Sequence, residues 1–79
     1  MVHELKKAIE EKKVLFGIKE IMKNTKNLEK VFVAADCRNE IIGILENNKI
    51  IMEPLDFSKD ELASKLTLDF KCEVFGLKK

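Results

Sequence analysis

The stretch Lys30-Val31-Phe32-Val33-Ala34-Ala35 decides the fold of this chain. Its apolar residues follow one another without interruption, and several of them are β-branched or aromatic, as is typical of strands. A strand that exposed one face to water would instead alternate apolar and polar side chains. The sequence therefore predicts a central strand over residues 30–35, with helices on both faces of its sheet.

Helical and strand-like patterns alternate on both sides of this strand. The spacing of apolar residues predicts helices over 3–13, 18–27 and 39–47 and from residue 58 onward, and strands over 14–16, 49–53 and 72–77. Residues 14–16 can alternatively be the extended entry to the next helix. Strands that are joined through helices can return in the same direction. We therefore expect one α/β domain over residues 1–79, a three-layer α/β/α sandwich with a mixed four-stranded sheet.

Several element ends are predicted from single residues. Asn39 is suited to cap the helix that follows it. Pro54 is expected to stop the strand over 49–53, because proline has no N–H for a sheet. Ser58 and Glu61 have the spacing of a capping box, which predicts a helix start there.

Length and composition indicate a small globular domain. The 79 residues are 46% hydrophobic and 37% charged, unlike a disordered segment. The formal net charge is only +1, so composition alone does not indicate nucleic-acid binding. The charge is unevenly distributed, because residues 1–39 hold nine Lys and Arg against six Asp and Glu, or +3, whereas residues 40–79 hold six against eight, or −2.

Redox, membrane and catalytic functions have little support in the sequence. Cys37 and Cys72 form no C-x-x-C pair, so we expect small, partly buried thiols in a cytoplasmic protein and no metal site. No apolar run approaches the roughly 18–20 residues that span a bilayer, so we expect a soluble protein. His3 has no evident catalytic partner, and Asp60 and Glu61 suit the first turn of a helix. We therefore expect neither an enzyme nor a cofactor.

Residues 17–23, Gly-Ile-Lys-Glu-Ile-Met-Lys, form the first candidate site. Gly17 allows a partner to approach the backbone closely, and the helix that follows offers free N–H groups. Lys19, Lys23 and Lys26 are spaced i, i+4 and i+7, which predicts a basic stripe on the outer face of that helix. A glycine turn beside a row of lysines suits a phosphate backbone.

The residues after the central strand form a second candidate region, because loops at strand ends often carry function. Arg38 is equally suited to a phosphate or base contact and to a surface ion pair. Asp36 is more typical of a cap or a turn.

Three segments together resemble the ribosomal kink-turn-binding superfamily, which contains the ribosomal proteins L-seven-Ae and L-thirty-e. Residues 17–23 resemble its G-x-N/K-E-x-x-K helix start, and residues 31–37 resemble its apolar strand that ends in an acidic residue. Residues 58–62, Ser-Lys-Asp-Glu-Leu, resemble the S-K-x-E-L of its last helix. The likeness covers nearly the whole chain. It implies an L-thirty-e-like RNA-binding domain.

The resemblance also implies a ligand and partners. The ligand would be a structured RNA with a sharp bend and tandem sheared G·A pairs, such as rRNA or a small guide-type RNA. The protein would be a component of the ribosome or of another ribonucleoprotein particle, next to other proteins of that particle, and a monomer when free.

In this family, the helix start contacts the RNA. The resemblance therefore assigns RNA contacts to Gly17, Lys19, Glu20 and Lys23. Lysines at these positions would neutralise phosphates, and Glu20 would accept hydrogen bonds from a guanine edge. Lysine is found at the position of Lys19 in the L-thirty-e branch, whereas the tightest kink-turn binders have asparagine. The alternative is that Glu20 and Lys23 are only neighbours on a solvated helix, which they stabilise by about 0.2–0.5 kcal/mol.

The loop before the last strand departs from the family pattern. Residues 68–73 read Leu-Asp-Phe-Lys-Cys-Glu, where the family has apolar or small residues that touch extruded bases. Asp69 and Glu73 place negative charge where RNA would approach, which lowers affinity unless they point away. Phe70 can stack on a base or belong to the core. A protein-interaction domain of the same fold that has lost RNA binding is the alternative function, favoured by the pI of about 7.7.

Overall fold

The structure, a computed structural model, describes residues 2–79, and helices and strands alternate along the chain in the predicted order. The elements are α1 (Val2–Glu10), β1 (Val14–Phe16), α2 (Ile18–Lys23), the 3₁₀ turn η1 (Thr25–Asn27), β2 (Leu28–Val33), α3 (Asn39–Asn47), β3 (Met52–Pro54), α4 (Lys59–Lys65) and β4 (Val74–Lys78). The stretch over residues 14–16 is a strand and not only the entry to a helix.

The four strands form one mixed sheet in the order β1-β4-β2-β3. β4 lies between β1 and β2 and is antiparallel to both, whereas β2 and β3 run parallel. The last strand of the chain is therefore inserted at the centre of the sheet, beside the central strand predicted from the sequence. The predicted mixed four-stranded sheet is confirmed.

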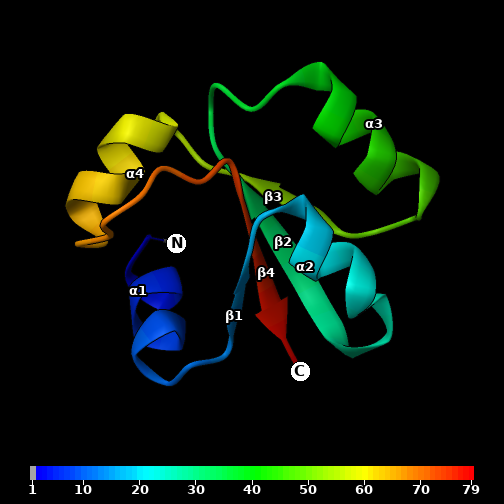
Figure 1. Ribbon diagram of the computed structural model, residues 1–79, viewed down its shortest axis with the longest axis horizontal. Helices are drawn as coiled ribbons and strands as arrows, with labels where there is room; N and C mark the ends of the chain where they lie inside the picture. The colour runs from blue at the N-terminus through cyan, green and yellow to red at the C-terminus, as the bar shows by residue number, and fades with distance from the viewer. Residues whose placement is uncertain (1) are drawn as a thin grey trace.

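Helices cover both faces of the sheet, with α1 and α4 on one side and α2 and α3 on the other (Figure 1). Successive residues of β2 enter opposite cores, because Val31 and Val33 pack on the α2–α3 side and Phe32 packs on the α1–α4 side. Other buried core side chains are Leu5, Leu62 and Phe75 on the α1–α4 side and Ile21, Leu45 and Val74 on the α2–α3 side. The apolar residues of β2 thus contribute side chains to both cores. The predicted three-layer α/β/α sandwich is confirmed.

The predicted helix over 18–27 is shorter than expected. α2 ends at Lys23, and a separate 3₁₀ turn occupies Thr25–Asn27. Asn24 interrupts the helix, because its side-chain amide donates a hydrogen bond to the Glu20 carbonyl at 2.9 Å and its backbone leaves the helical conformation. Thr25 lies on this 3₁₀ turn and is exposed.

Two predicted element ends are wrong and one is confirmed. Arg38, not Asn39, occupies the cap position of α3, and it makes no side-chain cap bond. β3 includes Pro54, which is tolerated because β3 is an edge strand and one side of it needs no partner. The capping box of α4 is confirmed, with the Glu61 N–H 3.2 Å from the Ser58 hydroxyl and the Ser58 N–H 3.0 Å from the Glu61 carboxylate.

Candidate nucleic-acid interface

An open cleft of about 190 Å³ lies where α2, α3 and β4 begin. Its lining residues are Gly17, Ile18, Arg38, Ile41, Lys71, Cys72, Glu73 and Val74. Gly17 and Arg38 came from two separate candidate regions of the sequence, and the fold brings them to the same site. Lys71 and Glu73 belong to the loop over residues 68–73, whose acidic residues depart from the family pattern.

The backbone conformation at position 17 requires a glycine. Its φ of 87° and ψ of 157° fall in a region that is almost exclusive to glycine. Its N–H donates a 3.3 Å hydrogen bond to the Val74 carbonyl, which ties the start of α2 to β4. A Cβ atom at Gly17 would meet no other atom within 4 Å. The space in front of this backbone is therefore open to a partner.

The charged residues of α2 face solvent beside the cleft. Lys19, Glu20 and Lys23 are exposed and do not line the cleft. Lys23 Nζ lies 3.9 Å from Glu20 Oε1, and both side chains are more than half exposed, at 72% and 55%. An ion pair of this kind is worth only about 0–1 kcal/mol, so both groups remain accessible. Lys26 is also exposed but lies on η1, beyond the end of α2.

Arg38 forms a surface ion pair, which is one of the two roles expected for it from the sequence. Its Nε lies 3.1 Å from Glu73 Oε1 and 3.3 Å from Oε2. The Arg38 side chain is still 63% exposed, whereas that of Glu73 is only 13% exposed. Because the contact uses Nε, the two terminal amino groups of the guanidinium can donate to another acceptor.

Glu73 is balanced by basic groups. Besides Arg38, the Lys59 ammonium lies 3.6 Å from its carboxylate. Two cations therefore offset Glu73, one of the two negative charges that the sequence placed in the path of an RNA, although its side chain lines the cleft and does not point away from it. In the same loop, Phe70 is 48% exposed and its ring packs edge-on against Phe16, with centroids 5.3 Å apart. Phe70 is thus neither buried core nor a free stacking platform.

Asp36 is a cap, as predicted, but of a helix distant in sequence. Its carboxylate accepts a 2.9 Å hydrogen bond from the backbone N–H of Lys59, the first residue of α4. A carboxylate at this end also favours the helix dipole. The bond joins the end of β2 to α4, and it holds Lys59 near Glu73.

Lys71 is the cleft residue that sequence reasoning missed. Its ammonium lies 2.7 Å from the Asp60 carboxylate in the first turn of α4. The pairing raises the pKa of Lys71 and lowers the pKa of Asp60. Both side chains are exposed, so the bond is readily exchanged for another partner. The sequence shows Lys71 only as one lysine between acidic neighbours, and nothing in it indicates the contact with α4.

The thiols of both cysteines have raised pKa values. Burial, assisted by the negative charge of Glu73, raises the pKa of the Cys37 thiol to about 11. Cys72 is buried, which raises the pKa of its thiol, and its Sγ donates to the Val74 carbonyl at 2.9 Å. Both thiols therefore stay protonated at neutral pH. Among residues 2–79 there is no cluster of His, Cys, Asp and Glu arranged to hold a metal ion, and no helix suited to crossing a bilayer.

Comparison with known proteins identifies the fold. No protein-family model and no curated protein sequence matches the chain. Among solved structures, the Giardia lamblia 15.5kD RNA binding protein is similar with a TM-score of 0.74 at 21% sequence identity, over 99% of this chain and 70% of that chain. The chain therefore has the fold of this protein.

Proposed function

We propose that this protein binds structured RNA through the cleft and the outer face of α2. The observation that carries the proposal is the fold likeness to a protein described as RNA binding, which extends over 99% of this chain. The likeness covers the elements that build the cleft, and one of the three segments that resemble the family, residues 17–23, begins at the cleft. Fold alone does not fix function, so the chemistry of the site must agree with it.

The charges and the open backbone of the site suit a phosphate chain. Lys19 and Lys23 are exposed beside the cleft and would neutralise phosphates. Gly17 leaves open space in front of its backbone, and Arg38 has free donors at the cleft rim. These groups position an RNA but do not select its sequence.

We further propose that the ligand is a sharply bent RNA of the kink-turn type, with tandem sheared G·A pairs. Glu20 is the group suited to selection, because a carboxylate accepts hydrogen bonds from the donor edge of a guanine. Its pair with Lys23 is long and exposed, so breaking it costs little. A cytoplasmic role in the ribosome or in another ribonucleoprotein particle, on rRNA or a small guide-type RNA, accords with such a ligand.

A binding titration tests this function. The purified protein is titrated into a labelled kink-turn RNA and into a matched RNA whose G·A pairs are replaced, each at two salt concentrations. We expect tight, salt-sensitive binding to the first RNA and weak binding to the second. Equal affinity for both RNAs would contradict selection of the bend, and no binding to either would reject the RNA function.

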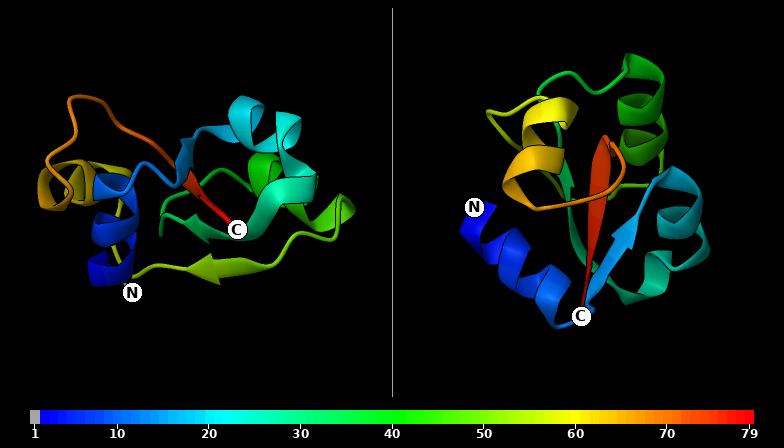
Figure 2. Two further views of the ribbon diagram at one scale, coloured as in Figure 1. Left: turned by 90° about the horizontal axis from the view of Figure 1, so that it is seen from below. Right: turned by 60° about the vertical axis from the view of Figure 1, so that its left-hand side comes forward.

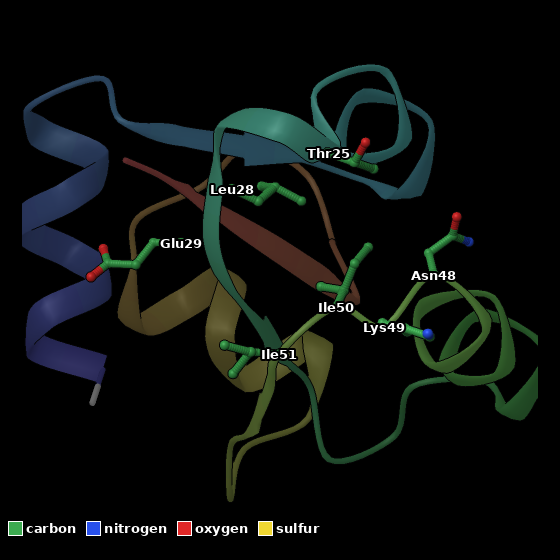
Figure 3. Close-up of a pocket in the computed structure, with 7 residues that line it drawn as sticks. All are labelled: Thr25, Leu28, Glu29, Asn48, Lys49, Ile50 and Ile51. Atoms are coloured by element: carbon green, nitrogen blue, oxygen red, sulfur yellow. The ribbon is translucent and has the colours of Figure 1, made fainter.

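A protein-interaction role is the second candidate, favoured by two hollows near the sheet edge. One, of about 270 Å³, is lined by the apolar residues Val33, Ile42, Met52 and Pro54. The other, of about 160 Å³, is lined by Thr25, Leu28, Glu29, Asn48, Lys49, Ile50 and Ile51 (Figure 3). Ile51 is 69% exposed. A protein bound there would dissociate with only a weak dependence on salt, whereas RNA binding depends on it steeply.

A further inference from the structure

A second group of lysines gathers at the end of the sheet opposite the cleft. It consists of Lys12, Lys13, Lys26, Lys78 and Lys79, which we call the sheet-end lysines. Backbone hydrogen bonds of 2.8 Å hold their three segments together, from the N–H of Lys78 to the Lys13 carbonyl and from the N–H of Lys79 to the Asn27 carbonyl. The ribbon views show the end of β4 between the loop after α1 and the η1 turn (Figures 1 and 2).

The sheet-end lysines are available to a partner. Lys12, Lys13, Lys26 and Lys79 are exposed, and Lys78 is partly so. Within residues 2–79, none of them has a carboxylate oxygen within 4.0 Å, whereas the basic residues around the cleft are partly paired. Glu11 and Glu29 lie next to these lysines in sequence, so the segments 11–13, 26–29 and 78–79 together carry +3 in a chain with a net charge of +1. The sheet end is therefore more basic than the chain as a whole.

Side-chain direction connects this group with α2. Side chains alternate along a strand, so Lys78 shares a face of the sheet with Val74, which packs in the core beneath α2 and α3. Lys26 lies just beyond the end of α2, and Lys23 is in the last turn of that helix. A basic track thus runs from Lys19 beside the cleft, along α2, to the sheet end.

The length of the track suits a nucleic-acid duplex. From Val74 at the cleft to Lys78 is four residues of strand, or about 13 Å. Duplex DNA carries one phosphate charge for about 1.7 Å of its axis, so this length of duplex would carry about eight phosphates, and those on the side facing the track could contact the lysines. An apolar protein surface would leave these ammonium groups without partners.

We propose that the sheet-end lysines are a second phosphate-binding surface, which holds a duplex arm of the RNA whose bend lies in the cleft. The proposal rests on the proposed function and names the part of the ligand that extends beyond the cleft. One face of the protein would then contact both the bend and a flanking helix, and affinity would depend on the length of that helix.

The test compares two RNAs and three proteins. One RNA is a kink-turn with arms too short to leave the cleft, and the other has arms longer by about one helical turn. The proteins are the unaltered chain, a triple variant with Lys12→Gln, Lys13→Gln and Lys78→Gln, and a control triple variant with Lys6→Gln, Lys49→Gln and Lys65→Gln. The control removes the same charge from lysines that lie outside the sheet-end group and that likewise form no ion pair within the described residues.

We expect the effect of the sheet-end variant to depend on the length of the RNA arms. The unaltered protein binds the long-armed RNA more tightly, and the sheet-end variant loses this gain while its affinity for the short-armed RNA is retained. The slope of log K against log salt for the long-armed RNA falls by about 2.7, because each lost phosphate contact contributes about 0.9. The control variant keeps the gain.

Two results would overturn the proposal. Equal affinity of the unaltered protein for both RNAs would show that the sheet end does not contact the RNA. Equal losses of affinity in the two triple variants would show the same. In either case, binding of the short-armed RNA leaves the cleft function standing. If the short-armed RNA does not bind but a plain duplex binds through the three lysines, the cleft function fails and the phosphate surface is retained.

Discussion

Arg38 and Glu73 meet at the rim of the cleft, with Arg38 Nε 3.1 Å from Glu73 Oε1. They are 35 residues apart in sequence, one at the start of α3 and the other just before β4. Because the Glu73 side chain is 13% exposed and that of Arg38 is 63% exposed, the carboxylate holds one edge of the guanidinium and leaves the other edge to solvent. The pair makes an acidic loop residue compatible with an approaching polyanion.

The pKa of the Cys37 thiol depends in part on the charge of Glu73. Its Sγ lies 3.9 Å from Glu73 Oε2, and its pKa of about 11 leaves only about one thiol in a thousand ionised at pH 8. We predict that Glu73→Gln lowers this pKa and accelerates alkylation of Cys37 at pH 8. The measurement is the rate of iodoacetamide labelling against pH, with the site identified by peptide mass spectrometry. A wild-type profile with its midpoint near 8.5, the value of a free cysteine, would contradict the partly buried, Glu73-facing thiol.

Gly17→Ala is predicted to destabilise the protein by about 1–3 kcal/mol, since alanine is strained at a φ of 87°. A Cβ there would clash with nothing, so the cost is conformational. Gly43→Ala is the matched control, because Gly43 lies within α3 and a Cβ would also meet open space. That variant is expected to gain about 0.5–1 kcal/mol. Thermal unfolding of the two variants should therefore shift in opposite directions, and a common direction would disprove the backbone argument.

Gly76 positions α2 on the sheet. A Cβ at this residue of β4 would lie 2.8 Å from Ile21 Cγ1 and 2.9 Å from Leu28 Cδ2, both in buried side chains. Gly76→Ala is therefore predicted to cost about 1–3 kcal/mol and to displace α2. Urea unfolding measures the cost, and RNA affinity should fall as the lysines of α2 move. An unchanged midpoint would show that α2 packs less closely than described.

Two residues of α2 are predicted to act differently on RNA. Lys23→Ala should weaken binding of any RNA and reduce the salt slope by about one contact. Glu20→Gln should instead reduce the preference for a kink-turn over a plain duplex, more than it lowers general affinity. Filter binding with both RNAs over a range of salt concentrations separates the two effects. Lys65→Ala, on α4, is the control for loss of a surface charge.

The fold was predictable because its main signals are local. The uninterrupted apolar run of β2 requires two covered faces, and the capping box of Ser58 and Glu61 fixes the start of α4. The errors come from competing interactions of single residues. Asn24 bonds back to Glu20 and ends α2 early, and Pro54 joins a strand because that strand is at the edge.

The site was predictable only in part, because it is assembled from distant segments. Sequence spacing relates Gly17 to the lysines of α2, but the pairing of Arg38 with Glu73 depends on the insertion of β4 beside β1 and β2. The cap from Asp36 to α4 likewise requires the end of β2 to lie beside that helix. Contacts of this kind leave no periodic pattern in the sequence.

An NMR titration of the ¹⁵N-labelled protein with a kink-turn RNA would locate the bound RNA on the protein surface. We expect the largest amide shifts at residues 17–23, at Arg38 and at residues 71–74, which surround the cleft. The same titration with an RNA lacking the G·A pairs should shift these amides less. Shifts confined to the hollow lined by Val33, Ile42, Met52 and Pro54, or no shifts at all, would contradict RNA binding by this site.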